Sequence, residues 1–556
     1  MKRTLALMLI LLLALWLPSC GREPVLQEGD TVTTSADAVI TLTIDSSYTV
    51  VRPEKAKATL TEAASDLRRV LSDLTGDSIK ITDDWLAPGK SPAEKEILIG
   101  ATNRTDASPL PRDDYRVYVL DGQLRIEGGS EDAVAAAVQA FIETCLTGTP
   151  TLTFPDGELL AHTGDYAVSA ITVGGTPIGD CTIVLPQGWI PYLDEVLLRE
   201  ANRLADGLGD LCGWRPAVTR GTGEGSGEFR FGHPDDDPTR WSVSARGITA
   251  GSTTALTKAV DALLDAAAAQ AKQTPTGIAL ESLGLSGDVS DILTIARTEG
   301  TDLRVMNSNI LWKPPANALL STPARMAVIA EAFTHYAPDI FTLQEMEAGI
   351  KKTLLPLLTA ADPKYTLVPS DDWQVIVYDQ TRMKLIDSGY EYFSPFEQSK
   401  GFLWAVFEMT DSSAGRRFVV SSAHYVLNPA NDESQGPVLR GLNSLQKAEK
   451  LSALREQYSC GAIAGGDYFA SKGAPAYENM IAAGFIDPAE TATVKKMGNT
   501  ATHHTLGEAN YAGKGIDLIL CTPDFAPLTH RIMVRNPYLM HATDHTPEYV
   551  DLAFAN

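Results

Sequence analysis

Cysteines are scarce in this sequence, and they follow no pattern. Six occur among 556 residues, with no Cys-x-x-Cys pair and no metal-ligand spacing. This absence excludes a metal site built on paired cysteines. The five that follow Cys20 are Cys145, Cys181, Cys212, Cys460 and Cys521. An odd number without pattern favours buried thiols, and one Cys181–Cys212 disulfide stays open as an alternative.

Positive charge is also in short supply. The chain has 46 Lys and Arg against 70 Asp and Glu, a formal net charge of −24. Because a phosphate backbone binds a basic face, this balance argues against broad nucleic-acid affinity. Residues 301–556 carry 21 basic and 28 acidic side chains, a net of −7, and the remaining 25 and 42 give −17. The acidity therefore lies mostly outside the C-terminal part.

Long apolar runs are absent apart from one near the start of the chain. Two basic residues precede the apolar stretch Leu5–Leu17, which is shorter than the roughly 20 residues that span a bilayer. The stretch ends in Leu-Pro-Ser-Cys and resembles a bacterial lipobox, with Cys20 as the lipidated residue. We therefore predict a lipoprotein signal peptide at 1–20, a tether at 21–37, and a lipid anchor at the extracellular face of the cell membrane. A plain secretory signal is the alternative.

At this length several domains are expected, and an internal repeat marks two of them, 38–165 and 166–297. In the first copy the patterns predict strands at 39–45 and 96–100, a hairpin at 115–127, and helices at 60–74 and 131–145. In the second they predict strands at 182–185, 228–232 and 241–245, and helices at 192–212 and 254–272. The clearest matches are Glu-Ile-Leu-Ile-Gly from Glu96 with Glu-Phe-Arg-Phe-Gly from Glu228, and a Gly-Ser pair ahead of the last helix.

The first copy, over about 38–148, resembles the small α/β domain that precedes the barrel in family 20 β-hexosaminidases and α-glucuronidases. The resemblance implies a carbohydrate-associated setting and possible contact with carbohydrate, with a structural role for the domain. Neither copy shows a catalytic cluster. Asp235-Asp236-Asp237 lies between two prolines and indicates a solvated loop rather than a cation site. No barrel of about 250 residues follows, which disfavours a glycosidase.

From residue 298 to 556, strands and helices alternate, which predicts a layered α/β sandwich. Strands are expected at 304–310, 340–344, 374–378, 403–408, 418–423, 460–465, 515–520 and 549–554, and helices at 323–335, 440–457 and 475–483. Polar residues stand at or near the ends of the apolar runs: Asn309, Glu345, His424, Asp467, Asp517, Asp544 and His545. Acids, a histidine and an asparagine at one sheet edge suit a divalent cation and a phosphate.

In order and spacing, VMNSNI, PDIFTLQE, FVVSSAH, GIDLIL and TDHTPEYVDLAF resemble the motifs of the endonuclease/exonuclease/phosphatase superfamily. The resemblance implies a deoxyribonuclease I-like four-layer α/β sandwich after the two repeated α/β units. It also implies Mg²⁺ or Mn²⁺ held by Asn309, Glu345 and Asp544. The other roles implied are His545 as general base or phosphoryl ligand, Asp517 as its orienting partner, His424 as a donor to a phosphoryl oxygen, and Asp467 as the residue that orients water or the leaving group.

The sequence departs from the family at one position. The Gly-Asp-Phe-Asn motif of the family is Gly-Asp-Tyr-Phe here, so Phe469 replaces an asparagine that binds the scissile phosphate. Another donor substitutes, the substrate is unusual, or the domain only binds. Lys514 is the one phosphate partner suggested by the motifs. His503 and His504 suggest a metal pair, but neighbouring strand residues point to opposite faces, so at most one of them is expected to touch substrate.

We therefore predict a monomeric, surface-anchored, Mg²⁺-dependent phosphodiesterase or phosphatase. Its substrate would be nucleic acid, a lipid head group or a phosphorylated glycan. The alternative is a catalytically degenerate surface protein that binds glycan or phosphate.

Overall fold

The structure is a computed structural model that describes residues 41–104, 108–147, 152–186, 193–222, 225, 227–234, 236–394, 400–411, 413–427, 434–495, 501–507, 515–533 and 538–555. The signal peptide with Cys20, the tether, Asp235 and Lys514 lie outside these residues. Within them, no helix has the length and apolar character needed to cross a bilayer. The five described cysteines are all free thiols, so Cys181 and Cys212 form no disulfide.

The first α/β domain is a compact unit of its own. Its six-stranded sheet has the order β3-β2-β4-β6-β5-β8, and β1 pairs with β7 in a separate two-stranded sheet. The strands are β1 (Thr41–Thr43), β2 (Thr49–Arg52), β3 (Lys80–Asp83), β4 (Glu96–Ile99), β5 (Tyr115–Leu120), β6 (Gln123–Gly128), β7 (Thr153–Pro155) and β8 (Gly157–His162), and the helices are α1 (Ala58–Thr75) and α2 (Glu131–Phe141). A π-helical turn, Ile142–Leu146, extends α2.

The second α/β domain has a six-stranded sheet with the order β12-β11-β13-β15-β14-β17, so each strand has the same relative place as in the first sheet. Its elements are β11 (Thr182–Leu185), α3 (Asp194–Cys212), β12 (Ala217–Arg220), β13 (Glu228–Pro234), β14 (Arg240–Ser244), β15 (Gly247–Ala250), α4 (Thr253–Gln273) and β17 (Leu285–Asp288), with β9 (Ile171–Val173), β10 (Thr176–Pro177) and β16 (Ile278–Ala279) in a small extra sheet. One predicted equivalence is wrong. The strand that matches β11 is β2, whose Thr-Val-Val run is buried, and within the predicted run 39–45 the structure describes β1 of the two-stranded sheet.

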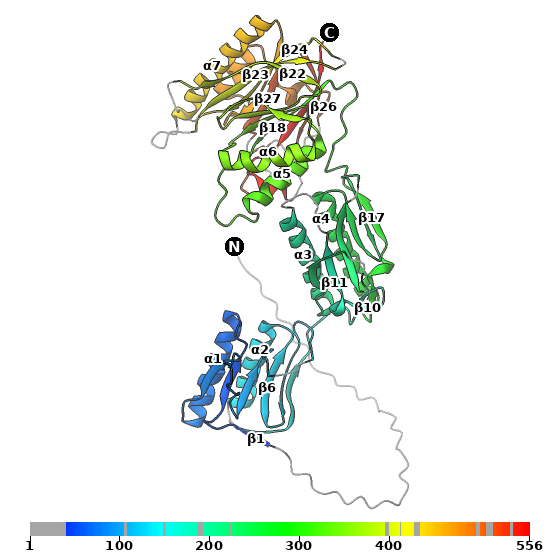
Figure 1. The fold of residues 1–556 in the computed structure, drawn as a ribbon, viewed down its shortest axis with the longest axis vertical. Helices are drawn as coiled ribbons and strands as arrows, with labels where there is room; N and C mark the ends of the chain where they lie inside the picture. Colours follow the sequence, from blue (N-terminus) through cyan, green and yellow to red (C-terminus); the bar gives the residue numbers. More distant parts are fainter. Residues whose placement is uncertain are drawn as a thin grey trace, which may run out of the picture. The chain divides into compact units, whose positions relative to one another are not determined.

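The C-terminal part is a four-layer sandwich (Figure 1), as the resemblance predicted. A seven-stranded sheet, β20-β21-β19-β18-β29-β28-β26, faces a five-stranded sheet, β22-β23-β24-β25-β27. The first sheet contains β18 (Leu303–Asn309), β19 (Ile340–Gln344), β20 (Tyr365–Leu367), β21 (Val375–Asp379), β26 (Val494–Lys495), β28 (Phe525–Ile532) and β29 (Glu548–Phe554). The second contains β22 (Met383–Tyr392), β23 (Gly401–Met409), β24 (Arg417–His424), β25 (Gly461–Asp467) and β27 (Asp517–Cys521).

Helices cover both outer faces of the sandwich. The helices α5 (Thr322–Tyr336) and α6 (Ala348–Ala361) pack on the seven-stranded sheet, and α7 (Gln435–Tyr458) and α8 (Pro475–Ala482) pack on the five-stranded sheet. Two short helices complete the set, α9 (Pro488–Thr491) and α10 (Leu539–Ala542). The sequence patterns had not predicted α6, which contains Pro356, or β28, which contains Pro527.

Strand alternation decides which side chains lie between the two sheets. On β18, Leu303 and Val305 belong to the core between the sheets, whereas Met306 faces the helices. On β24, Phe418 and Val420 lie between the sheets, and Val419 faces α7. Asn309 and His424, which end these strands, lie an even number of positions from the inter-sheet residues and so point to the same side of the sheet. The strand ends therefore deliver polar groups to one edge of the inter-sheet core.

The second α/β domain and the sandwich belong to one compact unit with a shared apolar core. Helix α3 packs against α5, and the buried Glu331 of α5 accepts hydrogen bonds from the backbone N–H and the hydroxyl of Thr253, the first residue of α4. A carboxylate at a helix N-terminus meets unpaired N–H groups. This contact fixes the second domain on the helical side of the sandwich.

Candidate active site at the edge of the two sheets

The strand register brings the predicted site residues together. In the five-stranded sheet His424 is opposite Asp467, and Asp467 is opposite Asp517, so three strands place these side chains in one row. In the seven-stranded sheet Asn309 is opposite Gln344, the residue before Glu345. The two sheets meet at this edge, where the amide Nδ2 of Asn309 donates to Asp467 Oδ2 over 3.1 Å.

A network of buried polar side chains joins the two sheets next to these site residues. Asn307 Oδ1 accepts from the Thr342 hydroxyl at 2.8 Å and from Gln344 Nε2 at 3.0 Å. Gln344 Nε2 also donates to Ser422 Oγ on the other sheet at 3.0 Å. All of these residues are fully buried. Since buried polar groups need their partners, this network fixes the relative position of the two sheets beneath the site.

His545 and Asp517 form a buried, oriented pair. His545 Nδ1 lies 2.8 Å from Asp517 Oδ2, which leaves Nε2 toward the site, 3.9 Å from Asp467 Oδ2. Burial by itself lowers the pKa of His545, but the charges of Asp517, Asp467 and Asp544 outweigh it and raise that pKa to about 10. The Thr502 hydroxyl accepts the backbone N–H of Asp517 at 3.0 Å and so holds the strand end in place.

Asp467 is fully buried at the centre of the row. Its Oδ1 accepts the backbone N–H of Phe469 at 3.0 Å, and its Oδ2 accepts from Asn309. Burial and the neighbouring charge of Asp517 raise its pKa above the usual range of a carboxyl group. A carboxyl group with a raised pKa is suited to exchange a proton.

A lysine that sequence reasoning had missed completes the row. Lys400 Nζ lies 2.6 Å from Nε2 of His424, which in turn lies 3.6 Å from Asp467 Oδ2 and 4.0 Å from Glu345 Oε1. Burial, together with the charge of Lys400, holds the pKa of His424 well below its usual range, so its imidazole is neutral. Lys400 directly precedes β23, whose first residue pairs with His424, so the register of the two strands places it here.

Two of the predicted metal ligands, Asn309 and Glu345, bind the backbone of one loop. Asn309 Oδ1 accepts the backbone N–H of Leu311, and Glu345 Oε2 accepts that of Trp312, each at 3.0 Å. The guanidinium of Arg325 is buried and donates to the carbonyl of Leu311 at 2.7 Å. Burial lowers the pKa of Arg325, and the charges of Asp544 and Glu345 oppose this shift. Carboxylate and amide oxygens at this edge fit a hard cation such as Mg²⁺.

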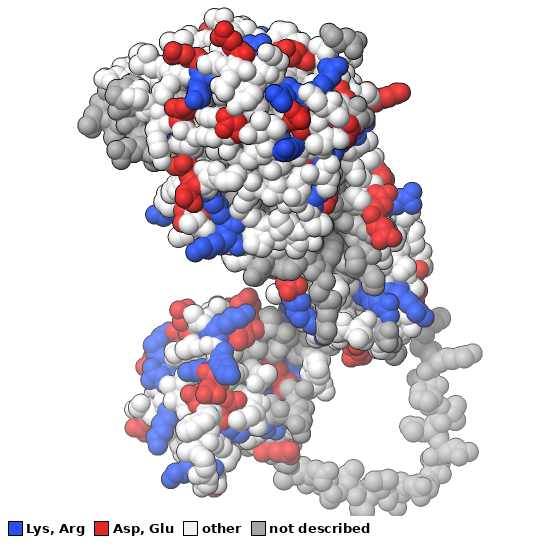
Figure 2. Space-filling model, turned by 45° about the horizontal axis from the view of Figure 1, so that its top comes forward, with Lys and Arg blue, Asp and Glu red and all other residues white. Residues whose placement is uncertain are grey.

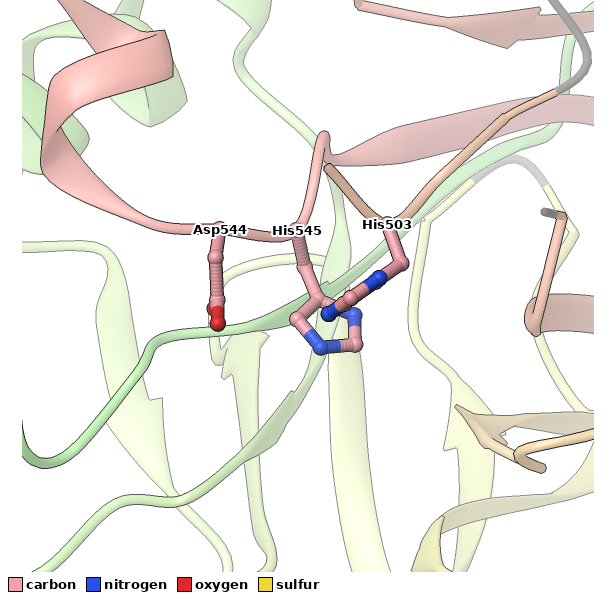
Figure 3. Close-up of side chains that lie close together, drawn as sticks. All are labelled: His503, Asp544 and His545. Atoms are coloured by element: carbon pink, nitrogen blue, oxygen red, sulfur yellow. The ribbon is translucent and has the colours of Figure 1, made fainter. Parts of the chain in front are cut away.

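Other acid and histidine groups come within ligand distance of one another. Among the described residues, the side-chain atoms of Asp467, Asp517 and His545 form one cluster and those of His503, Asp544 and His545 another, each within 4.8 Å. Figure 3 shows Asp544 and the two imidazoles pointing to the same side of the chain. The ring centroids of His503 and His545 are 5.0 Å apart. As predicted for adjacent histidines, His504 does not join this group.

Phe469 occupies the position of the missing asparagine in a strained conformation. Its φ is +50°, a region that bulky residues rarely adopt. The guanidinium of Arg440, on α7, lies 5.8 Å from the centre of the Phe469 ring. Burial lowers the pKa of Arg440, and the charge of Asp467 opposes this shift. Two cations that the motifs did not reveal, Lys400 and Arg440, therefore stand near the site.

Backbone strain is concentrated at this edge. Six non-glycine residues have positive φ among those described. Ala337 and Ser459 are helix C-caps and Asp121 forms the Asp-Gly hairpin turn, where such values are ordinary. The other three are Leu311, Glu345 and Phe469. Strain without a local structural reason is typical of functional sites.

The comparisons with known proteins give structural matches only. No model of a protein family matches this chain, and no curated protein shows significant similarity to it. An endonuclease/exonuclease/phosphatase from Bacteroides vulgatus matches 46% of this chain and 100% of its own, with 20% identity and a TM-score of 0.39. A mannosyl-6-phosphatase from Bacteroides thetaiotaomicron covers the same shares at 18% identity and 0.39. The human Nocturnin catalytic domain matches 47% of this chain and 97% of its own, at 19% and 0.34.

Proposed function

We propose that the C-terminal sandwich hydrolyses phosphate esters with the help of a divalent cation. The observation that carries this proposal is the buried His545–Asp517 pair, whose free Nε2 faces Asp467 at the edge where Asn309, His424 and Lys400 also converge. An oriented imidazole beside several carboxylates and a lysine combines proton transfer with anion binding.

Each residue then has a role that follows from its contacts. When bound at Glu345, Asn309 and Asp544, Mg²⁺ or Mn²⁺ would polarise the phosphoryl group and screen its charge. Asp517 fixes the ring of His545, so that Nε2 donates to a phosphoryl oxygen when protonated and accepts a proton from water when neutral. Lys400 supplies a donor to a non-bridging oxygen, and the neutral ring of His424, whose Nε2 accepts from the Lys400 ammonium, positions it. Asp467 orients the attacking water or the leaving group.

A binding protein is the second candidate, and Phe469 is the observation that favours it. A phenyl ring cannot donate to the phosphate, and losing one such donor costs roughly 10²–10³ in rate. The positioned His545–Asp517 pair argues for the enzyme, since a binding site has no need to orient an imidazole through a buried carboxylate.

The test is hydrolysis of bis-p-nitrophenyl phosphate and p-nitrophenyl phosphate by the purified full chain, with and without Mg²⁺ or Mn²⁺. We expect metal-dependent turnover that His545→Ala abolishes. His335→Ala, which removes a partly buried imidazole in the last turn of α5, is expected to keep the turnover. The preferred ester separates diesterase from monoesterase. Turnover no higher than that of His545→Ala on both esters would leave the binding protein as the better description.

We also propose attachment to the membrane through a lipid on Cys20, since the lipobox-like segment directly precedes it. Cys20→Ser is then expected to move the protein from the membrane fraction to the soluble fraction. An unchanged distribution would refute the anchor without touching the enzymatic proposal.

A further inference from the structure

Two exposed indoles lie together beside the candidate metal carboxylate. Trp312 is 44% exposed and Trp373 is 37% exposed, and their ring centroids are 5.3 Å apart at 51°. Among the described residues, Trp85 of the first domain is the only other tryptophan exposed to this degree. Paired indoles that stay in solvent forgo the burial that normally stabilises aromatic side chains, which marks a binding surface.

Both indoles are tied to the strand end that carries Glu345. The backbone N–H of Trp312 donates to Glu345 Oε2 at 3.0 Å, and the carbonyl of Trp373 accepts the N–H of Met346 at 2.9 Å. The pair therefore has a fixed place one hydrogen bond from a candidate metal ligand. A substrate whose phosphate lies at the site would bring its adjoining group onto these rings.

The turn that presents Trp312 is strained and held in place. Leu311 has φ +58° and Glu345 has φ +60°. The amide of Asn309 and the buried guanidinium of Arg325 hold the Leu311 peptide at its N–H and its carbonyl. A costly backbone fixed by buried groups indicates that the position of this indole matters.

The charges around the indoles select the kind of ring that stacks there. The loop before Trp373 carries two carboxylates, Asp371 and Asp372, and Asp372 Oδ1 accepts from the hydroxyl of the exposed Tyr392 at 2.8 Å. Lys351 is bound to the carbonyls of this loop, and Lys313 lies 5.7 Å above the Trp312 ring. On the face shown in Figure 2, acidic and basic side chains are intermixed without a broad basic area.

Nucleic-acid strands need a basic groove next to their stacking rings, whereas two carboxylates directly precede Trp373 and Lys351 is engaged by the carbonyls of the same loop. A sugar ring is neutral, presents C–H bonds that face the electron-rich indoles, and offers hydroxyl donors to carboxylates and tyrosine. We infer that Trp312 and Trp373 form a stacking platform for a hexopyranose ring whose phosphate is the group acted on. The inference rests on the proposed function for the phosphate and goes beyond it in naming the sugar.

The platform can be tested by binding, without relying on turnover. The probes are glucose 6-phosphate, glycerol 3-phosphate, which has no ring, and adenosine 5′-monophosphate, measured by calorimetry with Mg²⁺ on the full chain carrying His545→Gln. We expect glucose 6-phosphate to bind more tightly than the other two. Trp312→Ala and Trp373→Ala should each weaken it roughly tenfold, the size of an aromatic stacking contribution, and Trp312→Phe should restore most of the loss. Trp85→Ala is the matched control and should change nothing.

The outcomes separate the two proposals. Equal affinity for glucose 6-phosphate and glycerol 3-phosphate, or no effect of either indole, would overturn the platform while leaving ester hydrolysis intact. Tighter binding of adenosine 5′-monophosphate than of glucose 6-phosphate would overturn the sugar platform and indicate that a nucleobase stacks on the indoles. Ring-dependent binding in a protein that hydrolyses neither p-nitrophenyl ester would keep the platform and overturn the hydrolase.

Discussion

Replacing Phe469 with asparagine is expected to raise the turnover of phosphate esters and to leave the fold intact. The backbone already has the conformation that asparagine tolerates better than phenylalanine, with φ at +50°. The backbone N–H of residue 469 donates to Asp467 Oδ1, so the main chain at this position is held in place. The substituted amide would supply a donor where phenylalanine has none.

The opposing contributions to stability are small and nearly equal. A bulky residue in the left-handed region costs about 1–2 kcal/mol, part of which asparagine relieves. Against this, the variant loses the partial burial of the Phe469 ring, worth less than the ~1.5–3 kcal/mol of a fully buried side chain. It also loses the contact with Arg440 5.8 Å away, worth about 0.5–1 kcal/mol. We expect the free energy of unfolding to change by roughly 1 kcal/mol or less, and the rate to rise by about 10²–10³.

The assay is kcat for bis-p-nitrophenyl phosphate with Mg²⁺, beside urea unfolding of each variant. Phe469→Leu is the control, because it keeps an apolar side chain in the strained conformation and adds no donor. If Phe469→Asn folds normally and turns over no faster than Phe469→Leu, the missing amide does not limit catalysis, and the substitution of another donor, such as Arg440, becomes the explanation.

Three further predictions concern other contacts of the molecule. Asp517→Asn should lower kcat by roughly 10³–10⁴, as loss of the carboxylate that orients a catalytic histidine does elsewhere, with the Mg²⁺ concentration for half-maximal rate unchanged. Lys400→Gln should raise KM about tenfold, the worth of one charged hydrogen bond, and an unchanged KM would remove Lys400 from the phosphate site. Burial raises the pKa of Glu331 from 4.5 to about 7, so the folded state binds its proton more tightly and stability falls as pH rises through 7. Glu331→Gln should therefore remove about 2–3 kcal/mol of the stability difference between pH 5 and pH 8, measured by urea unfolding, and equal pH slopes in both proteins would contradict this.

The repeat of the two α/β domains could be recognised from the sequence, but one of its strands could not. The helices α1 and α3 have regular apolar spacing and end at a glycine with positive φ, which is a local signal. The choice between the runs at 39–45 and Thr49–Arg52 was not local, because both are short and apolar. Of the two runs, only Thr49–Arg52 forms a strand of the six-stranded sheet, where β2 lies between β3 and β4.

Two missed elements of the sandwich have a common reason. The helix α6 contains Pro356, and the strand β28 contains Pro527 followed by the polar run Thr529–Arg531, so neither shows an uninterrupted pattern. The α6 residues Leu354 and Leu358 are fully buried in the core, and β28 pairs along its length with β29. Tertiary packing and sheet pairing stabilise both elements despite the prolines.

The sequence by itself predicted most residues of the candidate site, and strand alternation determined the sheet face on which they lie. In β18, β24, β25 and β27 the polar residue keeps the alternation of the inter-sheet core, and this alternation is a property of the strand alone. The tertiary structure decided the register that aligns His424, Asp467 and Asp517. It also decided which residues from elsewhere join them, namely Lys400, Arg440 and the two exposed indoles. Register and long-range neighbours depend on contacts between segments far apart in the chain, and no local pattern encodes those.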